Sequence, residues 1–245
     1  MTKNFAHRGF SGKYPENTRI AFEAAVRTPG CDGIENDVHL TKDGQLVIIH
    51  DETLDRTSTN KKGFIKDMTL SELREAELSY VFKGQYEPQH ILTLAEYFDI
   101  VKDSDIVTNI ELKTGIFEYE GIEEKVLAEI KRYDIMERII ISSFNHFSVL
   151  RMKKLCPEIK CGLLTDSWLL NAGKYVKEAG IECYHPILWN NIPEVVEEVH
   201  GEGIEINTWT VNEEEDILRM LSLGVDSVIG NFPDRVTALR ESSAK

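Results

Sequence analysis

Residues 205–240, EINTWTVNEEEDILRMLSLGVDSVIGNFPDRVTALR, contain two copies of a strand followed by a helix. The short runs EINTWTV and SVIG are rich in β-branched and apolar residues, which is typical of buried strands. The two longer runs have apolar residues at helical spacing and acidic residues near their starts. Gly224 ends the first helical run, and Pro233 suits the first turn of the second. This alternation predicts βα units around a parallel sheet.

The same alternation extends along the whole chain. Strands are predicted at 4–7, 33–39 with 45–50, 106–112, 138–143, 160–164, 182–186, 205–211 and 227–230, the second pair being counted as one bent or split strand. Helices are predicted at 17–27, 121–133, 146–155, 168–179, 193–200, 213–223 and 233–240. Roughly residues 51–94 are irregular and are predicted to be an insertion after the second strand, with a short helix in 69–78 capped by Thr69 or Ser71.

Eight such units favour a TIM (β/α)8 barrel over an open doubly wound sheet, which needs fewer strands. A chain of 245 residues has the usual length of one such barrel, so residues 1–245 are predicted to form a single domain. The chain has no Gly-x-Gly-x-x-Gly turn, which argues against a dinucleotide site.

Composition limits the partners. The formal net charge of -14 argues against nucleic acid, because binding to a phosphate backbone needs a basic surface. No apolar run is long enough for a signal peptide or a membrane span, so we expect a cytoplasmic protein that binds a small molecule. A homo-oligomer is compatible with the sequence. The four cysteines, Cys31, Cys156, Cys161 and Cys183, have no close paired spacing and are predicted to be reduced packing residues.

Polar residues whose side chains can take part in catalysis or bind a ligand recur where the first strands end. They are His7 and Arg8 after the first strand, Glu35 and Asp37 on the second, His50 after its extension, and Glu111 and Lys113 around the end of the third. Because side chains alternate along a strand, Glu35 and Asp37 share one face. Residues at the carboxyl ends of barrel strands are candidates for catalysis. Each motif alone also fits a turn, a solvent-exposed strand face or an ion pair. Because all of the motifs fall at the same end of consecutive predicted strands, we favour a functional site.

Three carboxylates this close together would repel one another unless they share protons or bind a cation. Glu35, Asp37 and Glu111 offer only oxygen ligands, so Mg2+ or Ca2+ is expected rather than zinc. His7 and His50 suit an acid and a base, since an imidazole exchanges a proton near neutral pH.

Arg8 and Lys113 would bind a phosphate, whose charge the acidic protein otherwise repels at long range. Two aromatic residues, Trp209 and Phe144, are candidates to contact the apolar carbons of a substrate. A tryptophan on a barrel strand fits the core equally well.

These motifs resemble those of the glycerophosphodiester phosphodiesterases. The stretches that carry the resemblance are His7-Arg8-Gly9, Pro15-Glu16-Asn17-Thr18, Gly33-Ile34-Glu35-x-Asp37-Val38, Thr41-Lys42-Asp43-Gly44, His50-Asp51 and Glu111-Leu112-Lys113. Ser142-Ser143-Phe144, the Trp209 strand and Asn231-Phe232-Pro233 follow in the same order, so the resemblance covers nearly the whole chain.

The resemblance implies a TIM barrel with an insertion after its second strand. It also implies hydrolysis of glycerophosphodiesters to sn-glycerol 3-phosphate and an alcohol, with Mg2+ or Ca2+ as the metal. By motif, His7 and His50 would be the acid and base, Glu35, Asp37 and Glu111 the metal ligands, and Arg8 and Lys113 the phosphate clamps. Glu16 would support the first loop, and Asn17 or Thr18 would cap the helix after it.

The chain departs from the family pattern at Cys31, where a small residue is usual, and at Gly230-Asn231, where a Thr-Asp pair is common. These departures are expected to leave the chemistry intact and to bear on substrate preference. Two rival functions stay open at this point. One is a related barrel hydrolase for lysophospholipids or phosphoinositides, which a membrane-binding apolar loop would favour. The other is a non-catalytic barrel that binds glycerophosphodiesters.

Overall fold

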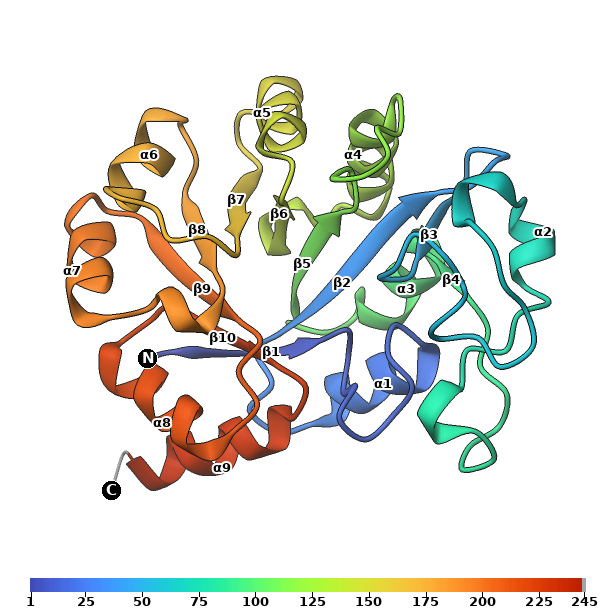
Figure 1. Cartoon of the computed structure of the whole chain (residues 1–245), viewed down its shortest axis with the longest axis horizontal. Helices are drawn as coiled ribbons and strands as arrows, with labels where there is room; N and C mark the ends of the chain where they lie inside the picture. The colour runs from blue at the N-terminus through green and yellow to red at the C-terminus, as the bar shows by residue number, and fades with distance from the viewer. Residues whose placement is uncertain (244–245) are drawn as a thin grey trace.

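The computed structural model describes residues 1–243, with side chains through Ser242, and has a closed barrel at its centre (Figure 1). The parallel barrel strands are β1 (Lys3–His7), β2 (Gly33–Leu40), β5 (Val107–Leu112), β6 (Ile139–Ser143), β7 (Lys160–Thr165), β8 (Cys183–Pro186), β9 (Glu205–Trp209) and β10 (Ser227–Gly230). β1 pairs with β10 on one side and β2 on the other, which closes the ring. The predicted TIM barrel is confirmed.

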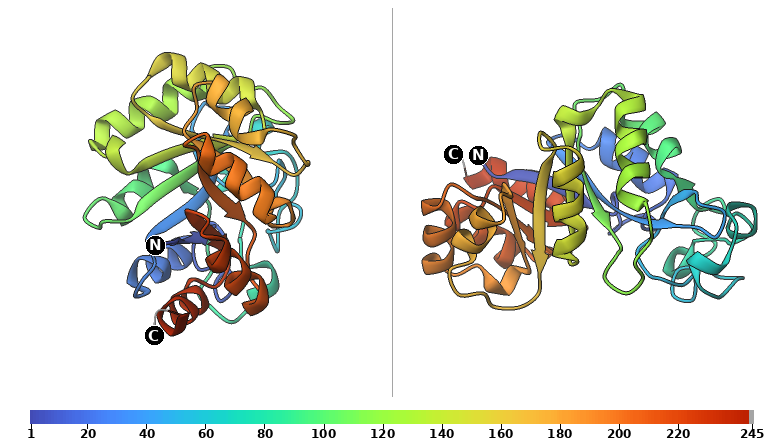
Figure 2. Two further views of the ribbon diagram at one scale, coloured as in Figure 1. Left: turned by 90° about the vertical axis from the view of Figure 1, so that its left-hand side faces the viewer. Right: turned by 90° about the horizontal axis from the view of Figure 1, so that it is seen from above.

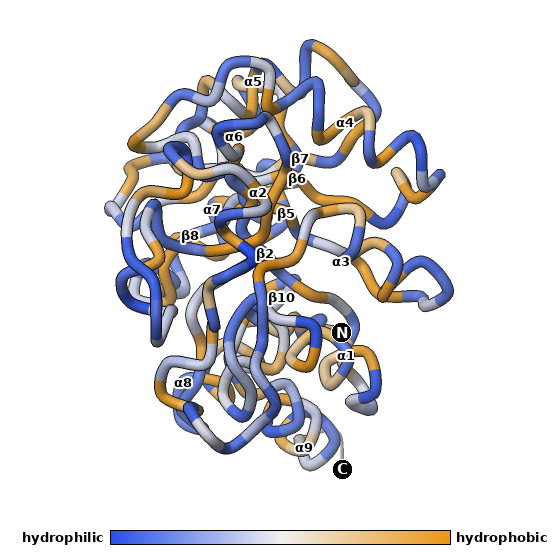
Figure 3. The backbone as a smooth tube through the Cα atoms, turned by 90° about the vertical axis from the view of Figure 1, so that its right-hand side faces the viewer, coloured by the Kyte–Doolittle hydropathy of each residue, from blue (hydrophilic) through white to orange (hydrophobic). Residues whose placement is uncertain are grey.

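Helices surround the strands (Figure 2). They are α1 (Arg19–Arg27), α3 (Leu94–Val101), α4 (Ile122–Tyr133), α5 (His146–Leu155), α6 (Ala172–Glu178), α7 (Pro193–Gly201), α8 (Glu214–Leu223) and α9 (Pro233–Ser243). Along α4 the tube alternates between hydrophobic and hydrophilic in Figure 3, as expected of a helix with one buried face. The main apolar core lies between the helices and the barrel, while Phe5, Ile140 and Ile229 come from separate strands and form a smaller apolar group.

The second predicted strand is wrong in one respect. Residues after Leu40 do not continue it, because the turn at Thr41–Gly44 reverses the chain, with Gly44 at φ +75°. β3 (Leu46–Ile48) therefore pairs antiparallel with β2, and β4 (Leu92–Thr93) pairs antiparallel with β3. These two strands lie outside the barrel, so the count of eight barrel strands is correct although the bent strand is a hairpin.

Helix α3 was not predicted, although its start carries a clear signal. Thr93 Oγ1 accepts a hydrogen bond from Glu96 N, and the Glu96 side chain accepts one from Thr93 N, which is a capping box. The irregular composition before Leu94 hid this start. α3 supplies the outer helix of the second βα unit.

The insertion lies at one side of the barrel, around α2 in Figure 1. It holds η1 (Ile65–Asp67), α2 (Leu70–Leu73) and η2 (Tyr80–Phe82), packed on an apolar cluster that includes Leu54, Ile65 and Leu73. Thr69 caps α2 as predicted, but the helix ends at Leu73 instead of reaching Leu78.

Two further expectations concern the cysteines and the membrane. All four cysteines are free, and three of them are buried, which confirms their reading as reduced packing residues. Within residues 1–243, no helix has the length and apolar character needed to cross a bilayer.

One close contact in the barrel gives a test of the packing. A Cβ built on Gly162 of β7 would lie 2.3 Å from Nε2 of the buried His185 on β8. We expect Gly162→Ala to lower the free energy of unfolding by roughly 1–3 kcal/mol, the usual range for overpacking. Urea unfolding measures the change. Gly201→Ala is the matched control, since a Cβ there meets no atom within 4 Å; equal urea midpoints for the two variants would contradict the prediction.

Candidate active site

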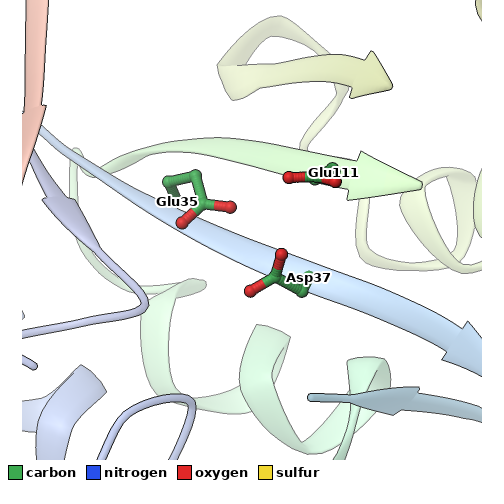
Figure 4. Close-up of side chains that lie close together, drawn as sticks. All are labelled: Glu35, Asp37 and Glu111. Atoms are coloured by element: carbon green, nitrogen blue, oxygen red, sulfur yellow. The ribbon is translucent and has the colours of Figure 1, made fainter. Parts of the chain in front are cut away.

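Three carboxylates meet inside the barrel near the carboxyl ends of two neighbouring strands. Glu35 and Asp37 come from β2 and Glu111 from β5, where Asp37 and Glu111 are in register (Figure 4). One oxygen from each side chain lies within 4.8 Å of the others, and all three side chains are buried. The predicted sharing of a face by Glu35 and Asp37 therefore holds, and Glu111 faces the same point.

Two cations border this cluster. Lys113 Nζ lies 2.7 Å from Glu111 Oε1 and 3.6 Å from Asp37 Oδ1. Arg8 Nε lies 3.5 Å from Asp37 Oδ2, and its Nη1 lies 3.0 Å from Glu16 Oε1. The structure thus brings together both basic residues and all three acidic residues that the sequence singled out, and Glu16 holds Arg8 in the first loop.

The three carboxyl groups differ in the direction in which their surroundings shift the pKa. Burial, together with the charges of Asp37 and Glu111, raises the pKa of Glu35 well above its usual range. Burial also raises the pKa of Glu111, although Lys113 acts in the opposite direction. Burial would raise the pKa of Asp37 too, but the charges of Lys113 and Arg8 lower it below its usual range. Asp37 is therefore the carboxylate that the surrounding cations keep ionised.

His7 stands at the end of β1. Its Nδ1 lies 2.7 Å from Asn231 Oδ1, so Nδ1 carries the proton and Nε2 is the basic nitrogen. Nε2 lies 3.9 Å from Glu35 Oε2. Burial and the charge of Arg8 lower the pKa of His7 to about 3. The sequence analysis had placed Asn231 outside the chemistry as a departure from the family pattern; the structure places it against His7.

His50 follows β3 and is oriented from two sides. Its Nδ1 lies 2.6 Å from Asp51 Oδ1, which again leaves Nε2 as the basic nitrogen. Arg56 donates to both oxygens of Asp51 and to Glu16, so it joins the loops that carry His50 and Arg8.

The buried His39 holds the backbone behind His50. Its Nε2 lies 3.1 Å from the His50 carbonyl oxygen and its Nδ1 lies 2.9 Å from Tyr119 Oη. The ring therefore donates from Nε2 to the carbonyl and accepts from the tyrosine hydroxyl. His39 acts on the position of His50 and not on a ligand in the pocket.

These groups open onto one pocket with a mixed lining. It is lined by His7, Arg8, Glu35, His50, Asn109, Glu111, Phe144, Leu164, Trp209, Thr210 and Ile229. Trp209 and Phe144 form an edge-to-face pair with ring centroids 5.4 Å apart, and Trp209 Nε1 donates to the His185 carbonyl oxygen at 2.9 Å. The pocket thus has a charged wall and an apolar wall, and both predicted wall residues line it.

Four polar residues in or next to the site were given no part in it by the sequence analysis: Asn17, Arg56, Asn109 and Asn231. Asn17 was expected to help cap α1, but its side-chain amide donates to Asp37 Oδ2 at 2.9 Å. Thr18 occupies the N-cap position without a side-chain cap and instead donates to the Pro15 carbonyl oxygen. Asn109 had a usable signal, because it stands two residues before Glu111 on the same strand face.

Comparison with known proteins agrees with this geometry. Residues 7–235 match the model of the glycerophosphoryl diester phosphodiesterase family. The chain belongs to this family. It is 45% identical to the glycerophosphodiester phosphodiesterase of Caldanaerobacter subterraneus subsp. tengcongensis, over 96% of both chains, and 45% identical to that of Bacillus altitudinis, over 98% and 99%.

Solved structures of the family share the fold as well. A phosphodiesterase of Oleispira antarctica, determined in complex with the product sn-glycerol-3-phosphate, superimposes with a TM-score of 0.89 at 28% identity over 98% of this chain and 97% of the other. The glycerophosphodiester phosphodiesterase of Thermotoga maritima gives 0.79 at 30% identity over 98% and 99%. The protein is accordingly an enzyme, a glycerophosphodiester phosphodiesterase.

The electrostatics of the phosphodiesterase site predict an unusual stability effect. Because the pKa of Glu35 is raised in the folded chain, the fold loses stability as the pH rises past the ordinary carboxyl range, so Glu35→Gln should stabilise the protein in EDTA at pH 8. We expect a gain of roughly 1 kcal/mol, or about 2–4 °C in Tm for a chain of this size. Calorimetry measures it, with the exposed Glu87→Gln as control. A lower Tm for Glu35→Gln in EDTA would contradict the assigned repulsion.

Proposed function

We propose that this enzyme hydrolyses glycerophosphodiesters to sn-glycerol 3-phosphate and an alcohol, with a divalent cation held by Glu35, Asp37 and Glu111 and with His7 and His50 as acid and base. The observation that carries the proposal is that two histidines, each with Nδ1 fixed by a neighbour, line the same pocket as Glu35 and Glu111. A polar residue set of this kind is what cleavage of a phosphodiester requires.

The residues present fit a hard cation. Asp37 Oδ1 is buried and accepts no hydrogen bond from any residue in the described part of the chain. The three side chains offer only oxygen atoms, which Mg2+ and Ca2+ prefer, and their mutual repulsion disappears when a cation lies between them. When bound, such a cation would polarise a phosphate oxygen and stabilise the charge that grows there.

Arg8 and Lys113 are proposed to bind the phosphate of the substrate. Both are already ion-paired, to Glu16 and Glu111 respectively, so their side chains are held in place; Arg8 lines the pocket, and Lys113 contacts Glu111 of its lining. Burial opposes the charged form of Lys113, but Glu111 and Asp37 outweigh it and raise its pKa, so Lys113 stays a cation. Two fixed cations would offset the long-range repulsion between an acidic protein and an anionic substrate.

His7 and His50 are proposed to move the protons. One ring is neutral, and its Nε2 takes the proton of the attacking hydroxyl as the new bond to phosphorus forms. The other ring starts as an imidazolium and donates its Nε2 proton to the alkoxide as the bond from phosphorus to the alcohol oxygen breaks. If the nucleophile is water, sn-glycerol 3-phosphate forms directly; if it is the neighbouring glycerol hydroxyl, a cyclic phosphate forms first and water opens it with the roles of the two rings exchanged. Asn231 and Asp51 hold the two rings in orientation through Nδ1. Each proton transfer is worth about 10² to 10⁴ in rate.

The apolar wall is proposed to bind the glycerol carbons. Trp209 is fixed by its hydrogen bond to the His185 carbonyl oxygen, and Phe144 packs edge-on against it. A rigid apolar surface opposite the charged wall would orient the glycerol part of the substrate relative to the histidines.

The assay that tests this function measures release of sn-glycerol 3-phosphate from glycerophosphocholine and glycerophosphoethanolamine through a coupled dehydrogenase. We expect product with added Mg2+ or Ca2+ and none with EDTA, because Arg8 and Lys113 offset only part of the carboxylate charge, and the remainder repels the phosphate. Metal binding itself is read separately, as a rise in Tm with metal that Glu35→Gln abolishes. Undiminished product release in excess chelator would contradict the proposed metal dependence, and metal-loaded, folded enzyme without product would contradict the substrate.

The two histidines have a prediction of their own. His7→Ala and His50→Ala should each lower kcat by about 10² to 10⁴, the range for loss of an acid or base, while the metal-dependent rise in Tm is kept. His90→Ala is the matched control, because His90 lies in the insertion and bonds the Ala76 carbonyl oxygen away from the pocket. A near-normal kcat for either site variant would remove that histidine from the mechanism.

A further inference from the structure

Large apolar side chains project into solvent from three consecutive loops at the carboxyl edge of the barrel. Their members are Phe144 and Phe147 after β6, Trp168 and Leu170 after β7, and Trp189 and Ile192 after β8, here called the aromatic rim. Trp168 and Trp189 are 59% and 60% exposed, Phe147 74% and Leu170 94%. Two of the three tryptophans of the chain thus face water.

The three loops adjoin one another. Asn190 Nδ2 donates to the Ser167 carbonyl oxygen at 2.8 Å, which ties the loop of Trp189 to that of Trp168. His146 Nε2 bonds the Leu164 carbonyl oxygen at 2.9 Å, which ties the start of α5, beside Phe147, to the end of β7. In Figure 1 these loops precede α5, α6 and α7, away from the insertion at α2. The rim is therefore one surface.

The rim is continuous with the pocket. Phe144 lines the pocket and is also 41% exposed, and it packs against Trp209 deeper inside. Leu164, another lining residue, stands at the end of β7, directly before the loop that carries Trp168. An apolar path thus leads from the candidate active site to the outer surface.

Charge is almost absent from these loops. Residues 144–150, 165–171 and 187–192, which include the first half of α5 as well as the loops, contain a single charged residue, Asp166, in a chain of which 29% is charged; α5 then continues with Arg151, Lys153 and Lys154. Scattered apolar residues on a surface need no explanation, but a contiguous patch without charges marks a binding surface. The chain as a whole carries a formal net charge of -14, while the rim itself is nearly uncharged, so a neutral or zwitterionic partner fits it better than an anionic one.

We propose that the aromatic rim docks the enzyme onto a lipid surface with zwitterionic headgroups, with the mouth of the pocket facing the headgroup layer. Tryptophan and phenylalanine suit this place, because their rings partition into the boundary between headgroups and acyl chains. The choice of occupant rests in part on the proposed function: a lipid surface presents phosphodiester headgroups to the pocket mouth, which is the chemistry that the site is proposed to bind. The rim is a set of exposed apolar side chains of the kind that a membrane-binding loop requires.

The test compares the full-length enzyme with the triple variant Trp168→Ser, Leu170→Ser, Trp189→Ser in co-sedimentation with phosphatidylcholine vesicles. Wild-type enzyme should bind, and the variant should bind at least about tenfold more weakly, since burial of one large apolar side chain already exceeds a factor of ten. The double variant Leu155→Ser, Leu218→Ser is the matched control, because both residues are exposed apolar side chains on outer helices. The double variant should bind the vesicles like wild type. Addition of the anionic lipid phosphatidylglycerol to the vesicles should weaken the binding of all three proteins.

Turnover of glycerophosphocholine is measured in parallel and should be equal in wild type and triple variant, because the rim residues that are changed do not line the pocket. If neither enzyme turns over this substrate but vesicle binding differs, the proposed function fails and the docking surface stands. Absence of wild-type binding, or equal binding by the triple variant, overturns the docking proposal. So does a wild-type dimer in sedimentation velocity that the triple variant abolishes, because the rim is then an interface between copies.

Discussion

The arrangement of the site depends on the repulsion among three buried carboxylates. Glu35, Asp37 and Glu111 lie too close together to be ionised at once without compensation. Arg8 and Lys113 offset part of this charge and keep Asp37 ionised, while Glu35 and Glu111 have raised pKa values. A cluster of this kind lowers the stability of the folded chain, which supports the proposal that these residues serve to bind a cation and not to stabilise the fold.

Barrel geometry makes this cluster attainable. Parallel strands in register present residues from different parts of the chain at one edge, which is how Asp37 of β2 comes to face Glu111 of β5. The hairpin that follows β2 returns the chain to the same edge and delivers His50. Arg56 then links the insertion to the first loop through Asp51 and Glu16. The insertion therefore positions a candidate catalytic group as well as adding its own apolar cluster.

The two sides of the pocket mouth differ in chemistry. The insertion side is joined by ion pairs of Arg56, whereas the rim side is apolar and nearly uncharged. In the proposed function, this asymmetry would orient the substrate, with its phosphate toward Arg8 and Lys113 and its carbons toward Phe144 and Trp209. It also gives an acidic enzyme one face that a zwitterionic surface does not repel.

The sequence by itself determined the barrel, the residues of the acidic cluster and both histidines, because strand alternation and the common edge of parallel strands are local or topological rules that a pattern carries. It did not determine the hairpin after Leu40, since a bent strand and a hairpin differ only in long-range pairing. Helix α3 was missed although its capping box at Thr93 and Glu96 is a local signal, because that signal closes an irregular segment. Asn231 beside His7, Asn17 beside Asp37 and the joining of three loops into the rim were decided by tertiary structure alone. Each of these contacts joins residues that are distant in the chain, so it forms only once the barrel has closed.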